Sequence, residues 1–257
     1  MRLLNCLICN KPTDFFSKGK ILNKYEISYY KCSNCGFVQT ESPYWLNEAY
    51  NSAITDSDIG LVSRNLELLK IVTAILKIYF PRLKKGIDFG GGYGIFTRLM
   101  RDSGYDFEWY DLYCENLFAK GFEKKLDHYD VLTAFELFEH FDNPMEQIKT
   151  LMDLGDNIIC STELLPTTTP AISEWWYYSE ETGQHISFYS KETMYYIAHH
   201  FNRYYLNYKN IHVFSKKQLF PKNIKMICRS HALINYILKR ESLLLKDYKY
   251  ITGKTLK

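Results

Sequence analysis

A glycine-rich turn between a predicted strand and a predicted helix constrains this chain most. Residues 86–89 form a short apolar run that predicts a strand, and residues 95–100 return to helical spacing. The turn between them, from Asp88 to Gly94, reads DFGGGYG. Because glycine lacks the Cβ atom that would obstruct an approaching ligand, the turn predicts a ligand site at the end of this strand.

The spacing of the glycines excludes two common phosphate-binding turns. Counted from Gly90, Ile95 stands where a dinucleotide fingerprint has its third glycine. A nucleotide-triphosphate loop ends in Gly-Lys-Ser/Thr, which this turn does not. The form here is acidic-x-Gly-x-Gly-x-Gly.

Strands and helices alternate on both sides of this turn. Further strands are predicted at 107–112, 130–135 and 157–162, and an antiparallel hairpin at 204–214. Helices are predicted from residue 61 to just before Pro81, and at 95–100, 114–120, 144–152, 190–201 and 231–245. The pattern predicts an α/β fold, Rossmann-like and doubly wound, with a mostly parallel sheet and an antiparallel C-terminal hairpin.

Four of the seven cysteines form two like pairs. They are Cys6, Cys9, Cys32 and Cys35, in two Cys-x-x-Cys turns. Two such turns predict a tetrahedral structural Zn²⁺ site with no open position for chemistry, and a redox dithiol or chance pairs are the alternatives. The remaining cysteines are expected to be small buried apolar residues.

The glycine turn resembles motif I of the class I S-adenosylmethionine-dependent methyltransferases. Asp111 follows Asp88 by 23 residues, and the stretch from Asp130 to His140, DVLTAFELFEH, resembles the motif after the fourth strand in ubiquinone-type and sugar methyltransferases. The resemblance implies that Asp88 lies near the methionine amino group of the cofactor and that Asp111 binds its ribose. It further implies that these residues line S-adenosylmethionine: Gly90, Gly92, Gly94 and Ala134. Tyr113 is expected either to pack on the adenine or to be an ordinary surface tyrosine.

Methyl transfer to a hydroxyl group needs a base, and histidines follow two of the predicted strands. His185 is the first candidate, since imidazole titrates near neutral pH. His140 and Glu139 are further candidates, and each histidine can instead serve to fix its loop. A divalent ion held by Glu136, Glu139, His140 and His185 is the alternative, as in some quinone O-methyltransferases.

Two segments on the acceptor side point to the substrate. The stretch GQHISF at 183–188 resembles the histidine segment of zinc-ribbon methyltransferases of glycan and sugar pathways. The aromatic block WWYY at 175–178 is either a stacking platform for a sugar or the packed underside of a lid.

Charge is divided unevenly along the chain. Residues 203–257 carry 13 Lys and Arg and two acidic residues, which is a net charge of +11. Because the whole chain has a net charge of +3, residues 1–202 have a net charge of −8. This basic stretch indicates either a polyanionic partner or a solvated helix face. At 46% hydrophobic and 24% charged residues the chain is not disordered, and no apolar run is long enough to span a bilayer.

The sequence therefore predicts four parts and one principal function. The parts are a zinc segment at 1–45, a helical connector at 46–83, the cofactor-binding core at 84–215 and a basic helical extension at 216–257. We expect a cytoplasmic enzyme, without a secretory signal, that O-methylates a nucleotide-linked sugar or surface glycan. The alternatives are RNA methylation, against which the missing base-flipping motif counts, and a non-catalytic module that docks a glycan-assembly partner. Sugar C-methyltransferases share the paired cysteines but carry a large C-terminal domain.

Overall fold

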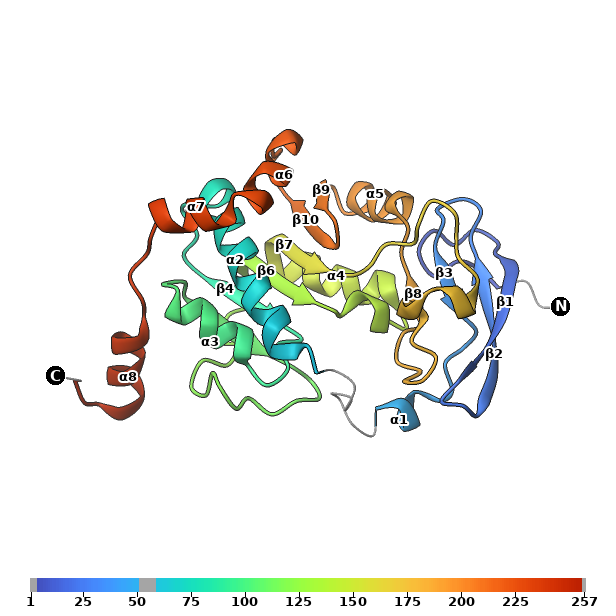
Figure 1. Cartoon of the computed structure of the whole chain (residues 1–257), viewed down its shortest axis with the longest axis horizontal. Helices are drawn as coiled ribbons and strands as arrows, with labels where there is room; N and C mark the ends of the chain where they lie inside the picture. Colours follow the sequence, from blue (N-terminus) through green and yellow to red (C-terminus); the bar gives the residue numbers. More distant parts are fainter. Residues whose placement is uncertain (1–3, 51–58, 256–257) are drawn as a thin grey trace.

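A six-stranded sheet forms the centre of the computed structural model, which describes residues 4–50 and 59–255 (Figure 1). Its strand order is β5-β4-β6-β7-β10-β9. The first four strands are parallel, and β10 joins β7 and β9 in antiparallel pairing. The strands of this sheet are β4 (Gly86–Phe89), β5 (Phe107–Tyr110), β6 (Tyr129–Phe135), β7 (Gly155–Ser161), β9 (Tyr204–Tyr208) and β10 (Ile211–Ser215). The predicted doubly wound sheet and its C-terminal hairpin are confirmed.

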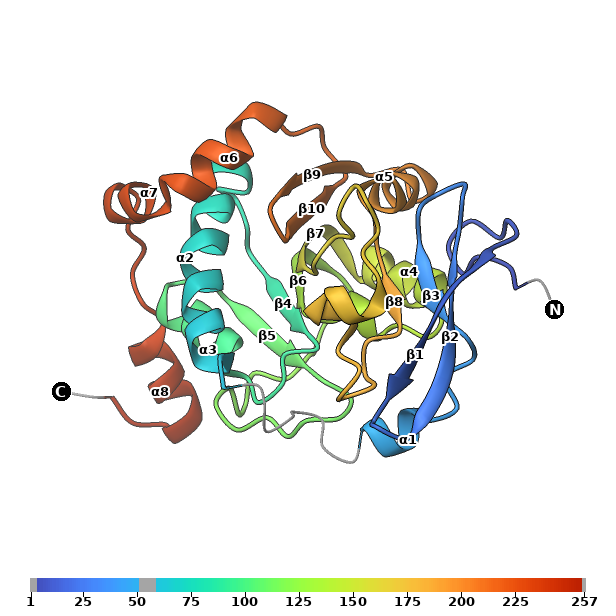
Figure 2. The same ribbon diagram turned by 45° about the vertical axis from the view of Figure 1, so that its right-hand side comes forward.

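Both faces of this sheet are buried, as expected for parallel strands covered by helices. Along β6, Leu132 and Ala134 face one apolar cluster, whereas Val131 and Phe135 face the other. The first cluster includes residues of α4 (Pro144–Leu154) and α5 (Lys191–His200), and the second includes residues of α2 (Leu61–Tyr79), α3 (Ile95–Asp102) and α6 (Pro221–Arg229). Figure 2 shows α2 and α3 on one side of the sheet.

Local signals in the sequence explain where several elements begin. Pro144 occupies the first turn of α4, where its missing N–H is not needed. Ser190 caps α5, because its Oγ accepts a hydrogen bond from the Thr193 N–H at 3.1 Å. Lys209, with φ +54°, makes the tight turn between β9 and β10.

A second sheet lies at the N-terminal end of the molecule, on the right in Figure 1. Its order is β1-β2-β3-β8, all antiparallel. Its strands are β1 (Asp14–Ile21), β2 (Tyr25–Lys31), β3 (Val38–Thr40) and β8 (Ser187–Phe188), and α1 (Leu46–Ala49) follows β3. Since β8 comes from residues 163–190, within the connection between β7 and α5, this sheet includes a strand from the part predicted as the cofactor-binding core.

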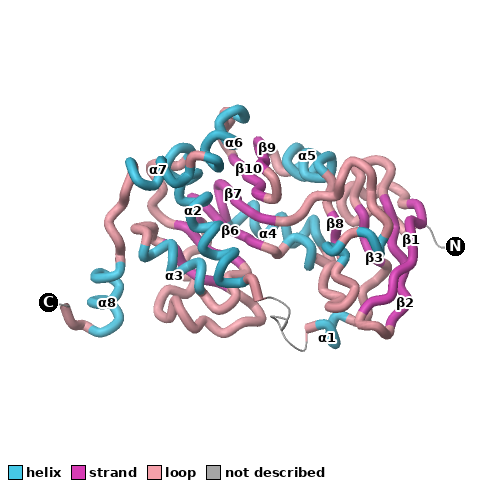
Figure 3. The backbone as a smooth tube through the Cα atoms, viewed as in Figure 1, coloured by secondary structure: helices cyan, strands magenta, loops and turns pink. Residues whose placement is uncertain are grey.

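Two predicted helices differ from the structure. Residues 114–120 form no helix but a loop, drawn in pink in Figure 3. The N–H groups of Leu117 and Phe118 both donate to the Tyr93 carbonyl oxygen at 3.0 Å, so the segment folds over the glycine turn instead of coiling on itself.

The predicted helix at 231–245 is interrupted. It divides into α7 (His231–Ile237) and α8 (Leu244–Thr252). Between them the chain reaches the end of α3, where the Leu243 N–H donates to the Arg101 carbonyl oxygen at 3.0 Å. Among the described residues, no helix combines the length and apolar character needed to cross a membrane.

Candidate functional site

The glycine turn lies at the carboxyl end of β4, where the direction of chain winding reverses. β4 is flanked by β5 on one side and β6 on the other, so the segments that follow β4 and β6 meet at this edge. Ligands of open α/β sheets bind at such a point. The turn is held by β5, because the N–H groups of Gly90 and Gly91 donate to the Tyr110 carbonyl oxygen at 2.8 and 3.1 Å.

Two of the glycines meet different surroundings. A Cβ atom on Gly94 would lie 2.7 Å from Asn116 Oδ1, so the loop after β5 requires glycine there. A Cβ atom on Gly92 would meet no atom of the described residues within 4 Å, so these residues leave open space on that side of the turn. Both have positive φ, +85° for Gly94 and +52° for Gly92. The open side of Gly92 is where a ligand can approach the backbone.

Asp111 directly follows β5 and is fixed by three backbone N–H groups. Its Oδ2 accepts from Gly92 at 2.9 Å, and its Oδ1 accepts from Tyr113 and Cys114 at 2.8 Å each. These bonds hold the carboxylate at the turn and leave further lone pairs on its oxygens, which can accept from a diol. The predicted ribose-binding residue is thus preorganised beside Gly92.

Asp88 lies beneath the turn and is buried. Its Oδ1 accepts from the Thr133 hydroxyl at 2.8 Å and its Oδ2 from the Thr97 hydroxyl at 3.2 Å. Burial raises the pKa of Asp88 to about 7. The residue ties β4 to β6 and α3, and its contact with the cofactor remains a prediction.

Tyr113 is 73% exposed and stacks on another tyrosine from the N-terminal part of the chain. Its ring centroid lies 5.6 Å from that of Tyr50, with the planes at 11°. Tyr50 directly follows α1. The predicted cofactor residue Ala134, by contrast, has its side chain buried in the apolar cluster on one face of β6.

Two glutamates follow β6, of which Glu136 is half-buried and Glu139 is buried. Glu136 has φ +48°, which is uncommon for a residue with a side chain and is found at strained functional positions. Its Oε1 accepts from Ser161 Oγ at 2.5 Å. Glu139 is fully buried, and neither carboxylate oxygen makes a hydrogen bond to a described residue. Burial raises the pKa of each glutamate to about 7, and their mutual repulsion adds to the rise for Glu136.

His140 and His185 lie edge to face, with ring centroids 5.0 Å apart. His140 Nδ1 is 3.1 Å from the Gln184 carbonyl oxygen, and His185 Nδ1 is 2.7 Å from the Tyr177 carbonyl oxygen. Because a carbonyl only accepts, we assign the ring proton to Nδ1 in both, which leaves each Nε2 with a free lone pair. Burial lowers the pKa of both rings, that of His140 to about 3, so both are neutral at pH 7.

Tyr50 connects this pair to the cofactor side. The Tyr50 hydroxyl oxygen lies 3.0 Å from His140 Nδ1. The ring of the same tyrosine stacks on Tyr113. A short path of contacts therefore runs from the Asp111 loop to the two histidines. Sequence reasoning missed Tyr50, because it lies outside every motif and nothing in its local pattern distinguishes it.

Three of the four residues proposed for a divalent ion come together. One ligand atom from each of Glu139, His140 and His185 lies within 4.8 Å of the others. Glu136 is not part of this group. The Glu139 carboxylate, which makes no hydrogen bond to the described residues, and the imidazole nitrogens are suitable ligands for a divalent transition metal.

The four paired cysteines also converge. Their sulfur atoms all lie within 4.8 Å of one another, with Cys6 to Cys35 at 3.6 Å and Cys9 to Cys32 at 3.5 Å. Zn–S bonds of about 2.3 Å in a tetrahedron place sulfurs about 3.8 Å apart, so the group fits zinc. A residue with left-handed backbone follows each pair, Asn10 (φ +56°) and Gly36 (φ +73°).

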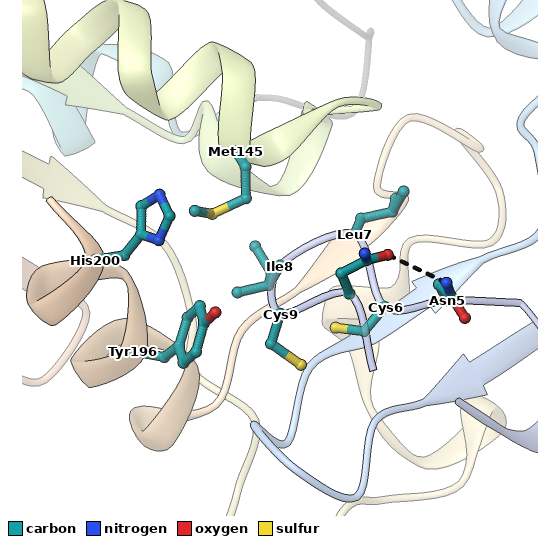
Figure 4. Close-up of a pocket in the computed structure, with 9 residues that line it drawn as sticks. Asn5, Cys6, Leu7, Ile8, Cys9, Met145, Tyr196 and His200 are labelled. Carbon is teal, nitrogen blue, oxygen red and sulfur yellow. Dashed lines mark hydrogen bonds between the residues drawn. The ribbon is translucent and has the colours of Figure 1, made fainter. Parts of the chain in front are cut away.

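A pocket of about 440 Å³ borders this cysteine group (Figure 4). Ile8 and Cys9 form one wall, and Met145 of α4 with Tyr196 and His200 of α5 form the other. The cysteine turn thus lies directly against the helices of the central sheet.

The aromatic block at 175–178 is mostly packed. Tyr177 and Tyr178 are buried, and the Tyr178 ring lies 5.6 Å from that of Tyr29 on β2. Only Trp176, at 74% exposure, has the surface that a stacking platform needs. The block as a whole is therefore the packed underside of residues 163–190.

Comparison with known proteins gives a family and several distant structural likenesses. A plantazolicin methyltransferase, BpumL, solved with a desmethylPZN analog and SAH, is 14% identical with a TM-score of 0.44, covering 64% of this chain and 76% of that one. An O-methyltransferase family protein from Burkholderia thailandensis is 14% identical with a TM-score of 0.46, covering 68% of each chain. Magnesium protoporphyrin IX methyltransferase from Synechocystis PCC 6803, with bound SAM, is 13% identical with a TM-score of 0.41, covering 66% of this chain and 87% of that one.

No curated protein matches the sequence. The model of the methyltransferase domain family, however, matches residues 63–207, more than half of the chain. This range contains the glycine turn, Asp111 and both candidate histidines. The chain therefore belongs to the methyltransferase domain family and is an S-adenosylmethionine-dependent methyltransferase.

Proposed function

We propose that this methyltransferase acts on a hydroxyl group of a sugar-type acceptor, with His185 as the general base. The observation that carries the proposal is the pair of neutral histidines with free Nε2 atoms, joined through Tyr50 to the Asp111 loop. Glu136 and Glu139 lie beside them, and an acceptor rich in hydroxyl groups supplies the donors that buried carboxylates need. The resemblance of residues 183–188 to sugar methyltransferases agrees with this choice.

S-adenosylmethionine supplies an activated methyl group on sulfur, and this chain's residues bind and orient the reactants. Asp111 accepts the ribose hydroxyls, while Gly92 lets the cofactor approach the backbone. On the acceptor side, His185 Nε2 would take the hydroxyl proton while the oxygen bonds to the methyl carbon, the bond from that carbon to sulfur breaks and S-adenosylhomocysteine leaves. The Tyr177 carbonyl holds the His185 ring in the required tautomer.

The variant His185→Asn tests the base. The asparagine amide can replace the Nδ1–H bond to the Tyr177 carbonyl but offers nothing at the position of Nε2. With nucleotide-linked sugars as acceptors, we expect turnover to fall about 100- to 10,000-fold, while calorimetric affinity for S-adenosylhomocysteine stays unchanged. His199→Asn, on the exposed face of α5, is the matched control. Unchanged turnover in His185→Asn would exclude the base.

The same experiments separate the rival functions. Asp111→Ala should abolish S-adenosylhomocysteine binding, whereas Asp127→Ala, at an exposed loop position, should not. Binding without turnover on any acceptor favours the docking module. Turnover on RNA, with an affinity that falls steeply as salt rises, favours nucleic-acid methylation.

A second candidate mechanism uses a divalent ion at Glu139, His140 and His185. The observation in its favour is the convergence of their ligand atoms, one of them from a carboxylate that makes no hydrogen bond to the residues that the structure describes. Metal analysis of the purified chain distinguishes the two mechanisms. A second bound metal that is lost in Glu139→Gln but retained in Cys6→Ser supports the ion, and a single metal lost only in Cys6→Ser supports the base.

We further propose that Cys6, Cys9, Cys32 and Cys35 hold a structural Zn²⁺. The convergence of four sulfurs supports this site, and four protein ligands leave no position open for substrate. The ion would stabilise the turns that carry the cysteines against α5, since the Cys35 carbonyl oxygen accepts from Ser190 Oγ at 3.0 Å and Thr193 Oγ1 at 2.7 Å.

A further inference from the structure

The C-terminal helices expose cationic side chains together with apolar ones. Residues 216–257 carry 11 Lys and Arg against Glu241 and Asp247. Asp247 is buried in ion pairs, with Arg101 at 2.6 Å and Arg98 at 2.7 Å. Glu241 is therefore the one acidic side chain that this stretch, where the structure describes it, leaves outside the buried cluster.

Two anchors fix which face of each helix points outward. On α7, Asn235 donates to the Lys70 carbonyl oxygen at 2.8 Å and accepts from Lys77 Nζ at 2.8 Å, so this face lies on α2. On α8, Asp247 fixes the inner face against Arg101 of α3. Figures 1 and 2 both show α7 and α8 at the end of the molecule that lies away from the N-terminal sheet.

Both helices also expose large apolar side chains, which we call the α7–α8 face. On α7 they are Leu233, Tyr236 and Ile237, with 60%, 84% and 65% exposure, and on α8 they are Leu244 and Leu245, with 51% and 62%. Exposed Lys239, Lys246 and Lys249 are interspersed among them. Single exposed apolar residues are ordinary, but five within 13 residues indicate an interaction surface.

We propose that the α7–α8 face binds the surface of an anionic lipid bilayer. Lysines beside leucine, isoleucine and tyrosine on short helices suit the boundary between headgroups and acyl chains. There the lysines are attracted to anionic headgroups, and the apolar side chains are removed from water. Leucine and isoleucine side chains make no favourable contact with the phosphates of a nucleic-acid backbone. A second copy would bring lysines against lysines, since a twofold interface repeats the same surface. The inference does not depend on the acceptor or on the catalytic base.

Vesicle co-sedimentation of the full chain tests the proposal. We expect binding to phosphatidylcholine vesicles that contain phosphatidylglycerol, weakening as salt rises, and no binding to phosphatidylcholine alone. Each of Lys239→Gln, Lys246→Gln and Lys249→Gln should lower the affinity about fivefold. The double change Tyr236→Ser with Ile237→Ser should abolish binding, whereas Phe15→Ser, an exposed aromatic on β1 at the other end of the molecule, should leave it intact.

Three results would overturn it. They are equal binding to neutral and anionic vesicles, no binding to either, and a dimer in sedimentation velocity that the double serine variant dissolves. RNA binding that depends on the three lysines but not on Tyr236 and Ile237 would assign the face to nucleic acid. Thermal unfolding of each variant checks the fold. The unfolding temperature should be unchanged because the altered side chains are exposed.

Discussion

Asp88 shows how a single residue of the site couples stability to pH. Its carboxylate lies under the glycine turn, where two threonine hydroxyls hold it and no residue within 4–50 or 59–255 forms an ion pair with it. Burial therefore favours the protonated form and raises the pKa to about 7, well above that of an aspartate in the unfolded chain. At a pH between the pKa of an aspartate in the unfolded chain and the pKa of Asp88 in the folded chain, the folded chain binds a proton that the unfolded chain has lost.

The sign of the effect follows from this difference. The contribution of the raised pKa to stability is complete below about pH 4 and is lost as the pH rises through about 7. Relative to Asp88→Asn, the wild type should therefore lose up to about 4 kcal/mol of unfolding free energy across this range. Urea unfolding of both proteins without cofactor at several pH values measures it, and parallel curves would contradict the assignment.

Individual site residues differ in how far the sequence predicts them. Asp111 and the histidines follow strands of a parallel sheet, whose carboxyl ends share one edge, so their approach is predictable. Tyr50 reaches His140 only because the chain after β3 folds back beside the loop after β5. Contacts of this kind depend on how two parts of the chain pack, which no local pattern records.

At the scale of elements, two glycines of the same turn have different roles: Gly94 is needed for folding and Gly92 for ligand binding. In Gly94→Ala the new Cβ atom would collide with Asn116, so we expect marked destabilisation. In Gly92→Ala it would enter open space, and the left-handed backbone costs about 1–2 kcal/mol. Gly92→Ala should therefore remain folded but bind S-adenosylhomocysteine at least tenfold more weakly. Calorimetry and thermal unfolding measure the two effects, and unchanged affinity would remove Gly92 from the cofactor site.

The elements that the sequence predicted correctly have their own local causes. Short apolar runs predicted the central strands, and Ser190, Pro144 and Pro81 marked helix boundaries. The predicted helix at 114–120 was wrong because its N–H groups bond to Tyr93 across the glycine turn. The interruption near residue 238 likewise results from a distant partner, since Arg101 holds the start of α8 on α3.

At the scale of the whole molecule, one ion-pair cluster ties the C-terminal end to the central sheet. Arg101 bonds Asp247 through two nitrogens, at 2.6 and 2.8 Å, and its guanidinium lies 3.7 Å from the centre of the Phe122 ring. Asp247→Ala leaves this buried cation without its main partner and should cost about 3 kcal/mol of unfolding free energy. Glu67→Ala breaks an exposed pair and should cost less than about 0.5 kcal/mol. Equal losses in urea unfolding would contradict the role of the cluster.

The cysteine site acts at the same scale, because β3 and the Ser190 contacts join it to the segment carrying His185. If zinc holds the cysteine turns, a strong chelator should lower turnover more than it lowers S-adenosylhomocysteine affinity. The cofactor residues lie on the other sheet and keep their contacts. Added Zn²⁺ should restore turnover in the chelated protein, and an equal loss of both properties would indicate general unfolding.

The shared strand β8 also determines which parts of this chain can be exchanged. Glu180 binds β1 through both its side chain and its carbonyl, to Lys20 N and Leu22 N at 2.8 Å each, while Ser187 and Phe188 pair with β3. Residues 4–50 and 163–190 therefore form one structural unit, although more than a hundred residues separate them in the sequence. A chimera that imports the acceptor preference of a relative has to transfer both segments together, and a recombination point between them would break the sheet.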